Sequence, residues 1–344
     1  MAENVFVGQI KGKDEKVRLD LLDRKIIYLL CKNARYSDTA IAKALRVRRE
    51  TVSYRIKRMV DEGFLHGFLT VVDSCRLGFR MHVLYLKLRD ANYDKTMVEE
   101  LLPLEQVSAL KNCGGSYDIV MFVTSRDLEE FDGFLDSLLS KYSGRIQDYL
   151  VLEVVEEDFT GIEMLLSPSE KKGLVIHEKK GSTFQQEIQS ARKTLSVVEI
   201  DATDRKILNI LSLDGRIPLA QLSEKAGLSV PAVENRVKRL IREEVIRSFM
   251  PLAALSHLGY QWYKVIFRTK NLDKKRFVAY LRTHSNVLWY TRVVGKWNYQ
   301  FSIFAKDNEE FNRILSEIRT EFAENIINYD SFIIFNQHKF VHRI

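Results

Sequence analysis

The sequence is best understood outward from one stretch, Thr51-Val52-Ser53-Tyr54-Arg55-Ile56-Lys57-Arg58-Met59. On a helix, with about 100° between successive residues, Val52, Ile56, Met59 and Val60 fall on one apolar face. The opposite face is polar and consists of Glu50, Thr51, Tyr54, Lys57 and Arg58, with Arg49 and Arg55 on its flanks. Glu50 is the only acidic residue from Arg46 to Met59, where six residues are basic. An ordinary surface helix usually mixes the two signs, so the stretch predicts a helix that enters an anionic groove.

This helix pattern occurs twice in the chain. Residues 55–60 (RIKRMV) recur as residues 236–241 (RVKRLI), and residues 23–26 (DRKI) recur unchanged at 204–207, each 181 residues later. Further on, Gly115 matches Gly295 and Tyr149 matches Tyr329, now 180 residues apart. The period is too long for a solenoid repeat, so we interpret it as a tandem duplication.

The bulk composition describes a globular protein with a modest excess of positive charge. The chain has 344 residues, 46% of them hydrophobic, and a net charge of +7. Three widely spaced cysteines, Cys31, Cys75 and Cys113, predict neither a disulfide framework nor a metal site, and they fit a reducing cytoplasm. The sequence shows neither a signal peptide nor an apolar run long enough to span a membrane. We expect a cytoplasmic protein without metal or cofactor.

Three helices and a hairpin are expected at the start of each copy. A helical pattern begins at Leu19, with Asp20 or Asp23 as capping acid, and a short second helix covers 39–45. Gly63 ends the third helix, and residues 64–72 are expected to form a strand, a turn and a second strand. The sequence therefore predicts a winged helix-turn-helix, whose third helix enters the major groove of DNA. Residues 1–18 are expected to form a loose arm or a leading strand.

In each copy, the segment after the helix-turn-helix is expected to contain both strands and helices. Strands are expected at 81–88, 105–112, 117–124 and 145–155, with helices at 93–102 and 127–142. The second copy has strands at 260–269, 286–294, 297–305 and 326–336, with helices at 273–284 and 307–322. This βαββαβ order predicts a ferredoxin-like sheet with helices on one face only. We expect the two bare faces to cover each other, as a pseudo-dimer within one chain.

A polar segment separates the copies and is expected to act as a linker, with one helix at 183–194. The predicted fold class is α+β. The expected segments are 1–68 (arm and first winged helix-turn-helix), 69–166 (first ferredoxin-like effector domain), 167–199 (linker), 200–250 (second winged helix-turn-helix) and 251–344 (second ferredoxin-like effector domain).

The strings LDRKI…LRVRRETVSYRIKRMVDEGFLHGF and NCGGSYDIVMFV resemble the Lrp/AsnC (feast/famine) family of transcription regulators. The resemblance occurs twice and covers nearly the whole chain apart from the arm and the linker. It implies a DNA-binding regulator whose ferredoxin-like domain often senses an amino acid. Family members usually carry one such unit and dimerise through the sheet domain, so this chain would be a covalent dimer. In one departure from the family pattern, Glu244 replaces the glycine that ends the recognition helix.

Both recognition helices carry candidate DNA contacts. The basic pair Lys57-Arg58 is kept as Lys238-Arg239, which suits phosphates, whereas Tyr54 is replaced by Asn235, which suits different base edges. Tyr54 is alternatively an ordinary surface tyrosine. The expected DNA-binding residues are Arg48, Arg49, Thr51, Tyr54, Arg55, Lys57, Arg58, Ala232, Asn235, Arg236, Lys238 and Arg239.

The glycine-rich turns are the candidate effector sites. Glycines let a ligand approach the backbone N–H groups, and Asp118 would accept from an α-ammonium group. Alternatively, the glycines only form a tight turn that Asp118 caps. In the second copy, Gly295-Lys296-Trp297-Asn298 replaces the family's Gly-x-x-Asp turn, which leaves the second site in doubt. The expected effector-binding residues are Gly114, Gly115, Tyr117, Asp118, Gly295, Trp297 and Asn298.

Two other functions stay open at this point. Siroheme decarboxylases resemble this family in both domains, and such an enzyme would use histidines; the chain has His66, His82, His177, His257, His284, His338 and His342, none of them paired at ligand-like spacing. A scaffold that has lost DNA binding is the third possibility, which the basic first helix disfavours. We expect no catalytic residue.

Overall fold

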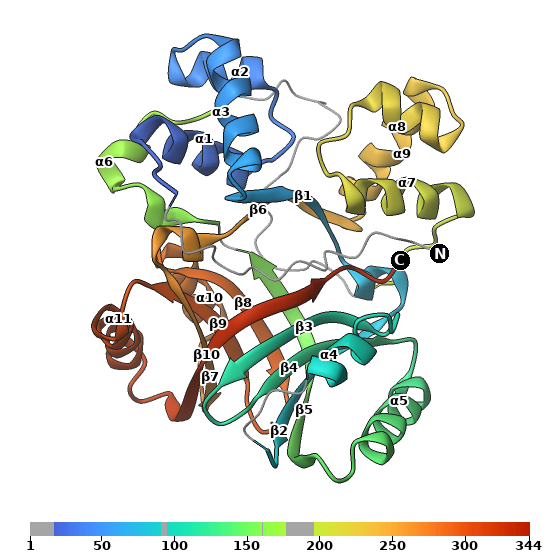
Figure 1. Cartoon of the computed structure of the whole chain (residues 1–344), viewed down its shortest axis with the longest axis vertical. Helices are drawn as coiled ribbons and strands as arrows, with labels where there is room; N and C mark the ends of the chain where they lie inside the picture. The colour runs from blue at the N-terminus through green and yellow to red at the C-terminus, as the bar shows by residue number, and fades with distance from the viewer. Residues whose placement is uncertain (1–16, 91–94, 160, 177–195) are drawn as a thin grey trace. The chain divides into compact units, whose positions relative to one another are not determined.

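The computed structural model describes residues 17–90, 95–159, 161–176 and 196–344 (Figure 1). These residues form two compact units. The helical unit contains residues 17–78 and Met164–Leu258, and the barrel unit contains Phe79–Glu163 and Gly259–Arg343. The expected helix at 183–194 and nearly all of the expected arm lie outside the described residues. None of the described helices combines the length and the apolarity needed to cross a lipid bilayer.

Two sets of three helices build the helical unit. They are α1 (Leu21–Lys32), α2 (Asp38–Leu45), α3 (Arg49–Asp61), α7 (Ala202–Leu213), α8 (Leu219–Ala226) and α9 (Val230–Arg242). Asp20 and Asp23 form a capping box at the start of α1, since each carboxylate accepts from the other's backbone N–H. Asp201 and Asp204 do the same for α7. The expected capping acids are thus confirmed, and both capping boxes fix where the first helix of each set begins.

The hairpin expected within residues 64–72 is not formed. A single strand, β1 (Leu65–Val72), pairs antiparallel with β6 (Ile246–Ala253) from the second copy. Residues 64–72 contain a strand, as expected, but its hydrogen-bonding partner lies in the other copy. The β1–β6 ribbon therefore joins the two winged helix-turn-helix domains where each would otherwise carry a hairpin of its own.

Reciprocal contacts reinforce this ribbon. The Gly215 N–H donates to the Phe68 carbonyl at 2.8 Å, and the Ala34 N–H donates to the Phe249 carbonyl at 2.9 Å. A Cβ atom at Gly215 would lie 2.9 Å from the backbone of Leu69, so only glycine fits this close approach. Arg35 donates to the Ile217 carbonyl, and its counterpart Arg216 donates to the Ala34 carbonyl. The two helix sets are thus connected by pairs of equivalent contacts.

The barrel unit contains the two expected βαββαβ orders. The first consists of β2 (Arg80–Leu88), α4 (Lys95–Leu101), β3 (Val107–Gly114), β4 (Ile119–Ser125), α5 (Leu128–Lys141) and β5 (Ile146–Phe159). The second consists of β7 (Gln261–Thr269), α10 (Lys274–Thr283), β8 (Val287–Val294), β9 (Tyr299–Ala305), α11 (Asn308–Glu321) and β10 (Ile326–Phe340). Short helical segments occur at η1 (Ser74–Leu77), η2 (Glu163–Leu165), α6 (Pro168–Lys171) and η3 (Leu255–Leu258).

The two sheets join edge to edge into one closed barrel, in the order β10-β3-β4-β2-β5-β8-β9-β7. The last strand of each order is longer than the sequence suggested because it belongs to both sheets. Strand β5 pairs with β2 up to Glu153 and continues along β8 to Phe159. Strand β10 pairs with β7 and continues along β3 to Phe340. Closure leaves neither sheet with a free edge.

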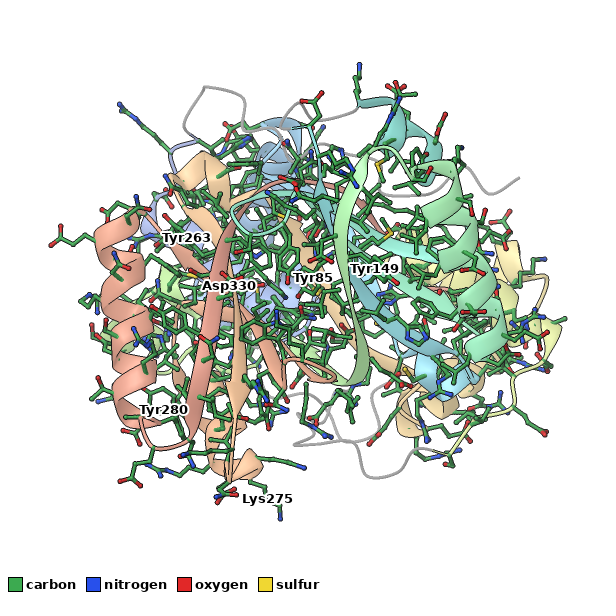
Figure 2. All side chains as sticks on the ribbon, turned by 90° about the horizontal axis from the view of Figure 1, so that it is seen from below. Tyr85, Tyr149, Tyr263, Lys275, Tyr280 and Asp330 are labelled. Atoms are coloured by element: carbon green, nitrogen blue, oxygen red, sulfur yellow. The ribbon has the colours of Figure 1, made fainter. Side chains whose placement is uncertain are left out.

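Each sheet packs one face against its own two helices. Leu84, Met121 and Leu138 belong to the first of these cores, and Phe267, Phe277 and Ile314 belong to the second. The remaining face of each sheet lines the barrel interior. Figure 2 shows Tyr85 in the middle of the barrel unit, where it is fully buried, and Lys275 at the periphery.

Candidate nucleic-acid interface and effector turns

Helices α2 and α3 form the first helix-turn-helix. The Ser37 hydroxyl caps α2 by accepting from the Ala40 N–H, and Arg46 ends it in the left-handed conformation with φ 55°. The Ser53 hydroxyl of α3 donates to Asp38 of α2 at 2.5 Å, which fixes the angle between the helices. In the second copy Gly227 takes the left-handed position, and Ser229 caps α9 as the sequence predicted.

The predicted inner face of α3 is confirmed at Val52, Ile56 and Met59, which are all buried. It is wrong at Val60, which is 40% exposed because it lies at the margin of that face. Its outer surface exposes Arg48, Arg49, Tyr54 and Lys57, and the Tyr54 side chain is 66% exposed. On α9 Asn235 is exposed, while Lys238 is half-buried beside Glu234, 2.9 Å away. Thr51 and Ala232 are half-buried at the margins of these surfaces. Sequence reasoning missed Arg46, which is exposed at the turn between α2 and α3.

The expectation that Arg58 faces outward is wrong. Its guanidinium lies 2.6 Å from the carboxylate of Asp23, which is fully buried at the start of α1. Arg55 contacts the same carboxylate at 2.8 Å and also Asp20 at 2.6 Å. These ion pairs raise the pKa of Arg55 and, together with backbone N–H groups, lower the pKa of Asp20, against the opposing effect of burial on each group. Both arginines therefore fasten α3 to α1.

The second copy repeats this arrangement. Arg236 lies 2.7 Å from Asp201 and 2.8 Å from Asp204, and Arg239 also donates to Asp204, which is fully buried. Arg239 was likewise expected on the outer face. We call each set, Asp23 with Arg55 and Arg58, and Asp204 with Arg236 and Arg239, an aspartate clamp. The signal for the clamps was present in the sequence, because DRKI and RxKR recur with the same offset.

The two glycine-rich turns are held by one acidic or amide side chain each. Asp118 accepts from the Leu88 N–H at 2.8 Å and from the Lys87 ammonium at 3.3 Å. Asn298, its counterpart, accepts from the Thr269 N–H at 2.7 Å. The amide oxygen of Asn298 thus accepts the same backbone hydrogen bond in the second copy that the Asp118 carboxylate accepts in the first. These contacts favour the structural alternative, in which the side chain caps the turn.

The glycines of these turns lie close to other strands of the barrel. Gly115 has φ +132°, and a Cβ atom there would lie 3.0 Å from the Cβ of Phe332. At Gly295, with φ +140°, a Cβ atom would lie 2.8 Å from the Leu152 side chain, and at Gly114 2.6 Å from the Phe335 ring. Tyr117 and Trp297 are both buried. The predicted effector residues thus gather around protein contacts, and their role in ligand binding stays a prediction.

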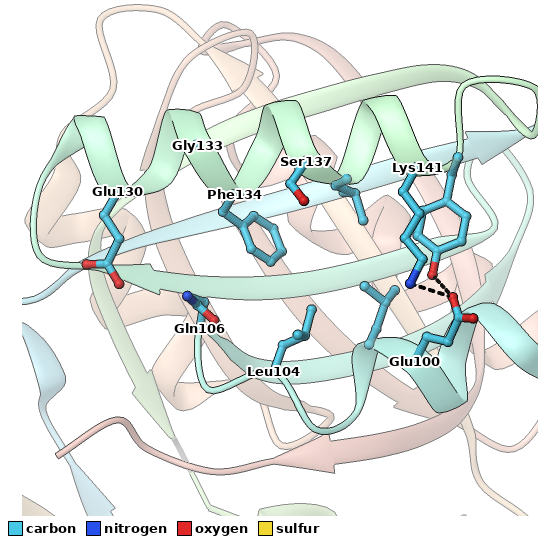
Figure 3. Close-up of a pocket in the computed structure, with 11 residues that line it drawn as sticks. Glu100, Leu104, Gln106, Glu130, Gly133, Phe134, Ser137 and Lys141 are labelled. Atoms are coloured by element: carbon cyan, nitrogen blue, oxygen red, sulfur yellow. Dashed lines mark hydrogen bonds and ion pairs between the residues drawn. The ribbon is translucent and has the colours of Figure 1, made fainter.

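A pocket of about 430 Å³ lies between α4 and α5, and the sequence had not suggested it. Figure 3 shows Glu100 and Glu130 at its opposite ends, with the Phe134 side chain between them. Glu100 accepts from the Tyr142 hydroxyl and lies 2.9 Å from the Lys141 ammonium, and these contacts lower its pKa. Gly133 contributes to the opening because it has no side chain; the corresponding residue of the second copy is Arg313.

Known proteins resemble the chain in sequence and in fold. The AsnC-type helix-turn-helix domain family matches residues 19–60, and a winged helix-turn-helix DNA-binding family matches residues 200–247. An uncharacterised HTH-type transcriptional regulator of Pyrococcus abyssi is 34% identical over 131 residues, which is 38% of this chain and 82% of the relative. The proline dehydrogenase transcriptional activator of Rhodobacter capsulatus is 26% identical over 40% of this chain and 94% of its own length.

Among solved structures, the siroheme decarboxylase NirDL has a TM-score of 0.60 and covers 94% of this chain and 93% of its own. At 14% identity this likeness concerns the fold alone. The helix-turn-helix matches and the identity to the Pyrococcus regulator concern the sequence itself. On that evidence, this chain belongs to the Lrp/AsnC family of DNA-binding transcriptional regulators.

Proposed function

We propose that one chain binds an asymmetric DNA site with two unlike recognition helices, α3 and α9. The observation that carries this proposal is that α3 and α9 belong to one compact unit, connected through the β1–β6 ribbon, yet differ at matching outward positions. Tyr54 occupies that position on α3 and Asn235 occupies it on α9. Single-unit relatives would need two chains to supply two helices, whereas here a pseudo-dimer within one chain supplies both.

The side chains divide into two roles under this proposal. Arg48, Arg49, Lys57 and Lys238 contact phosphates, because they are basic and reach the solvent from the recognition helices or their first residues. Tyr54 and Asn235 face base edges, and Thr51 and Ala232 border them. The arginines of the aspartate clamps, Arg55, Arg58, Arg236 and Arg239, position the recognition helices from behind.

We further propose that a small-molecule effector changes the affinity for DNA through the barrel unit. The family resemblance makes an amino acid the expected class, and the turns with Gly115 and Gly295 are the expected sites. Support for a ligand at these turns is weaker than for DNA at α3, since Asp118 and Asn298 each hold a neighbouring backbone N–H.

We propose a regulator rather than an enzyme, and two of the histidines named for the enzyme alternative make structural contacts. His82 is buried against Phe131 with the ring centroids 3.8 Å apart, and His338 contacts Asn112. An added tetrapyrrole is the discriminating probe: the regulator leaves its absorbance spectrum unchanged, whereas a shifted band would favour the decarboxylase-like function.

Selection of genomic fragments tests the proposed function. Purified full-length chain is mixed with sheared DNA of its source organism at moderate salt, and bound fragments are sequenced. We expect a small set of enriched fragments that share an imperfect palindrome with half-sites about one helical turn, or a multiple, apart. Uniform recovery of all fragments would contradict sequence-specific binding, and a perfectly symmetric motif would contradict unlike recognition helices.

A further inference from the structure

A row of polar side chains crosses the interior face of the second sheet. Lys264 of β7 lies directly opposite Ser302 of β9, and Gln300, two residues along β9, lies opposite Thr291 of β8. Residues two apart on a strand point to the same face. Their neighbours Tyr263, Phe301 and Ile303 belong to the core under α10 and α11, so the row faces the barrel interior.

The row is buried, and three of its polar atoms lack partners in the described part of the chain. Gln300 and Thr291 are 0% exposed, Ser302 is 1% exposed and Lys264 is 3% exposed. The Gln300 Nε2, Ser302 Oγ and Thr291 Oγ1 atoms have no hydrogen-bond partner among the described residues. Tyr85 of the first sheet donates to the Gln300 Oε1 atom, which turns the free Nε2 group away from Tyr85. A buried polar group without a hydrogen-bond partner destabilises the fold, so three together call for an explanation.

The equivalent positions of the first sheet show that the fold does not require this polarity. Val83 and Phe122 form the cross-strand pair that matches Lys264 and Ser302. Val120 matches Gln300, and it pairs with Lys111, which matches Thr291. Three of these four positions are therefore apolar in the first sheet and polar in the second. The polar row is a feature of one copy only.

Lys111 adds a second buried cation to the interior. It is 8% exposed, and its Nζ atom lies 5.0 Å from the ring centroids of both Phe122 and Trp262. The indole N–H of Trp262 is itself unpartnered among the described residues. Burial lowers the pKa of Lys111 to about 8 and that of Lys264 well below its ordinary value, the latter also because Lys111 is near.

The donors of the interior lack acceptors. Glu157, opposite Thr291, and Asp330, opposite Ile266, are carboxylates on the interior face. The Glu157 charge acts on both lysines, but neither ammonium makes a hydrogen bond with a described side chain. Buried donors of this kind are stabilised when an anion supplies acceptor oxygens to them.

We propose that the barrel interior binds the carboxylate group of a small organic acid, held by Lys264 and Lys111 and by the Gln300, Ser302 and Thr291 side chains. A carboxylate offers two acceptor oxygens to these donors. The pocket between α4 and α5 is a poorer candidate, because Glu100 and Glu130 at its ends already have cationic partners. The assignment of this carboxylate as the effector rests on the proposed function; the binding site itself does not.

Calorimetric titration of the full-length chain with sodium propionate tests the site, with propionamide as the neutral analogue and sodium phosphate as the inorganic source of an anion. We expect saturable binding of propionate, and neither binding of propionamide nor competition by phosphate at equal concentration. Lys264→Met is expected to weaken propionate binding roughly tenfold or more, as for the loss of one charge-assisted hydrogen bond. Lys275→Met, at an exposed lysine of the same unit, is expected to leave it unchanged.

Ser302→Ala is the milder second variant, should Lys264→Met fail to fold, and it is expected to weaken binding severalfold. Absence of propionate binding, equal binding of propionamide, displacement by phosphate, or unchanged affinity in Lys264→Met and Ser302→Ala would overturn the proposal. The titration contains no DNA, so its failure leaves the DNA-binding function standing. Failure of the genomic selection, in turn, leaves the titration unaffected.

Discussion

The aspartate clamps lead to a prediction that separates two neighbouring basic residues, Arg239 and Lys238. Arg239 donates to the buried Asp204, and its own side chain is 35% exposed. Replacing Arg239 with Met removes a charge-assisted hydrogen bond, which is generally worth about 1.5–3 kcal/mol. Since a third of the side chain reaches the solvent, the loss should fall near the lower end, at about 1.5 kcal/mol.

Lys238→Met is the matched control. Lys238 pairs with Glu234 one turn earlier on α9, and both side chains are more than a third exposed. Such a helical surface pair contributes about 0.3–0.5 kcal/mol, so the free energy of unfolding should barely change. Because Lys238 is a proposed phosphate contact, the salt dependence of DNA binding should instead flatten by about 0.9 in its logarithmic slope.

Two measurements on each variant decide between these roles. Urea unfolding followed by circular dichroism gives the change in stability, and fluorescence anisotropy with a selected fragment gives the affinity at several salt concentrations. We expect Arg239→Met to lower stability and Lys238→Met to lower the salt dependence. If Arg239→Met is as stable as the parent chain and loses a phosphate contact, the arginine belongs to the DNA interface and the clamp interpretation fails.

Four further predictions follow from single features of the chain. Glu244 has φ 59°, so Glu244→Gly should remove backbone strain and raise the free energy of unfolding by about 1 kcal/mol; lower stability in urea would contradict this. The Cys113 thiol is 5% exposed and burial raises its pKa, so native protein at pH 8 should leave it unmodified by iodoacetamide, as peptide mass spectrometry can show, while the other two cysteines react. Tyr54→Asn should make the two half-sites of the selected DNA more alike, and an unchanged motif would show that this residue reads no base. Residues 1–166 produced alone should self-associate, because two strand edges and an apolar sheet face lose their partners; a well-behaved monomer in sedimentation would count against the closed barrel.

Helical periodicity predicted the inner face of the recognition helix well. Val52 and Met59 are buried as expected, because a single amphipathic helix contains all the information needed to find its apolar side. Periodicity did not show that Lys57 is exposed whereas Arg58 contacts another helix. The difference between them is set by Asp23, which is buried on another helix, and a helical wheel contains no information about such a partner.

Strand patterns identified the strands but not their neighbours. Residues 64–72 were expected to contain strands, yet the choice between a local hairpin and pairing with β6 depends on the second copy. Strand β5 extends to Phe159 because β8 supplies a second pairing partner. Strand patterns could not reveal that Lys264 and Ser302 are buried, since alternation is the same whether the polar face meets water or the interior of a barrel.

At the glycine-rich turns, residue types alone did not distinguish a ligand site from a structural cap. Asp118 in a glycine-rich turn is compatible with a ligand and with a structural cap. The structure favours the cap because Asn298 makes the equivalent bond to a backbone N–H in the second copy. The acceptor oxygen is present in both copies, but its negative charge is present only at Asp118. A structural cap needs only the acceptor oxygen, whereas binding of an ammonium group would favour the charge.

Hydroxyl-radical footprinting of one selected fragment tests the central claim most directly. Full-length chain is compared with the Lys57→Met and Lys238→Met variants on the same DNA, at concentrations that saturate the parent chain. If one chain uses both recognition helices, the parent protects two half-sites about one helical turn, or a multiple, apart, and each variant weakens protection of a different half-site. Loss of the same protected region in both variants, or of neither, would contradict it.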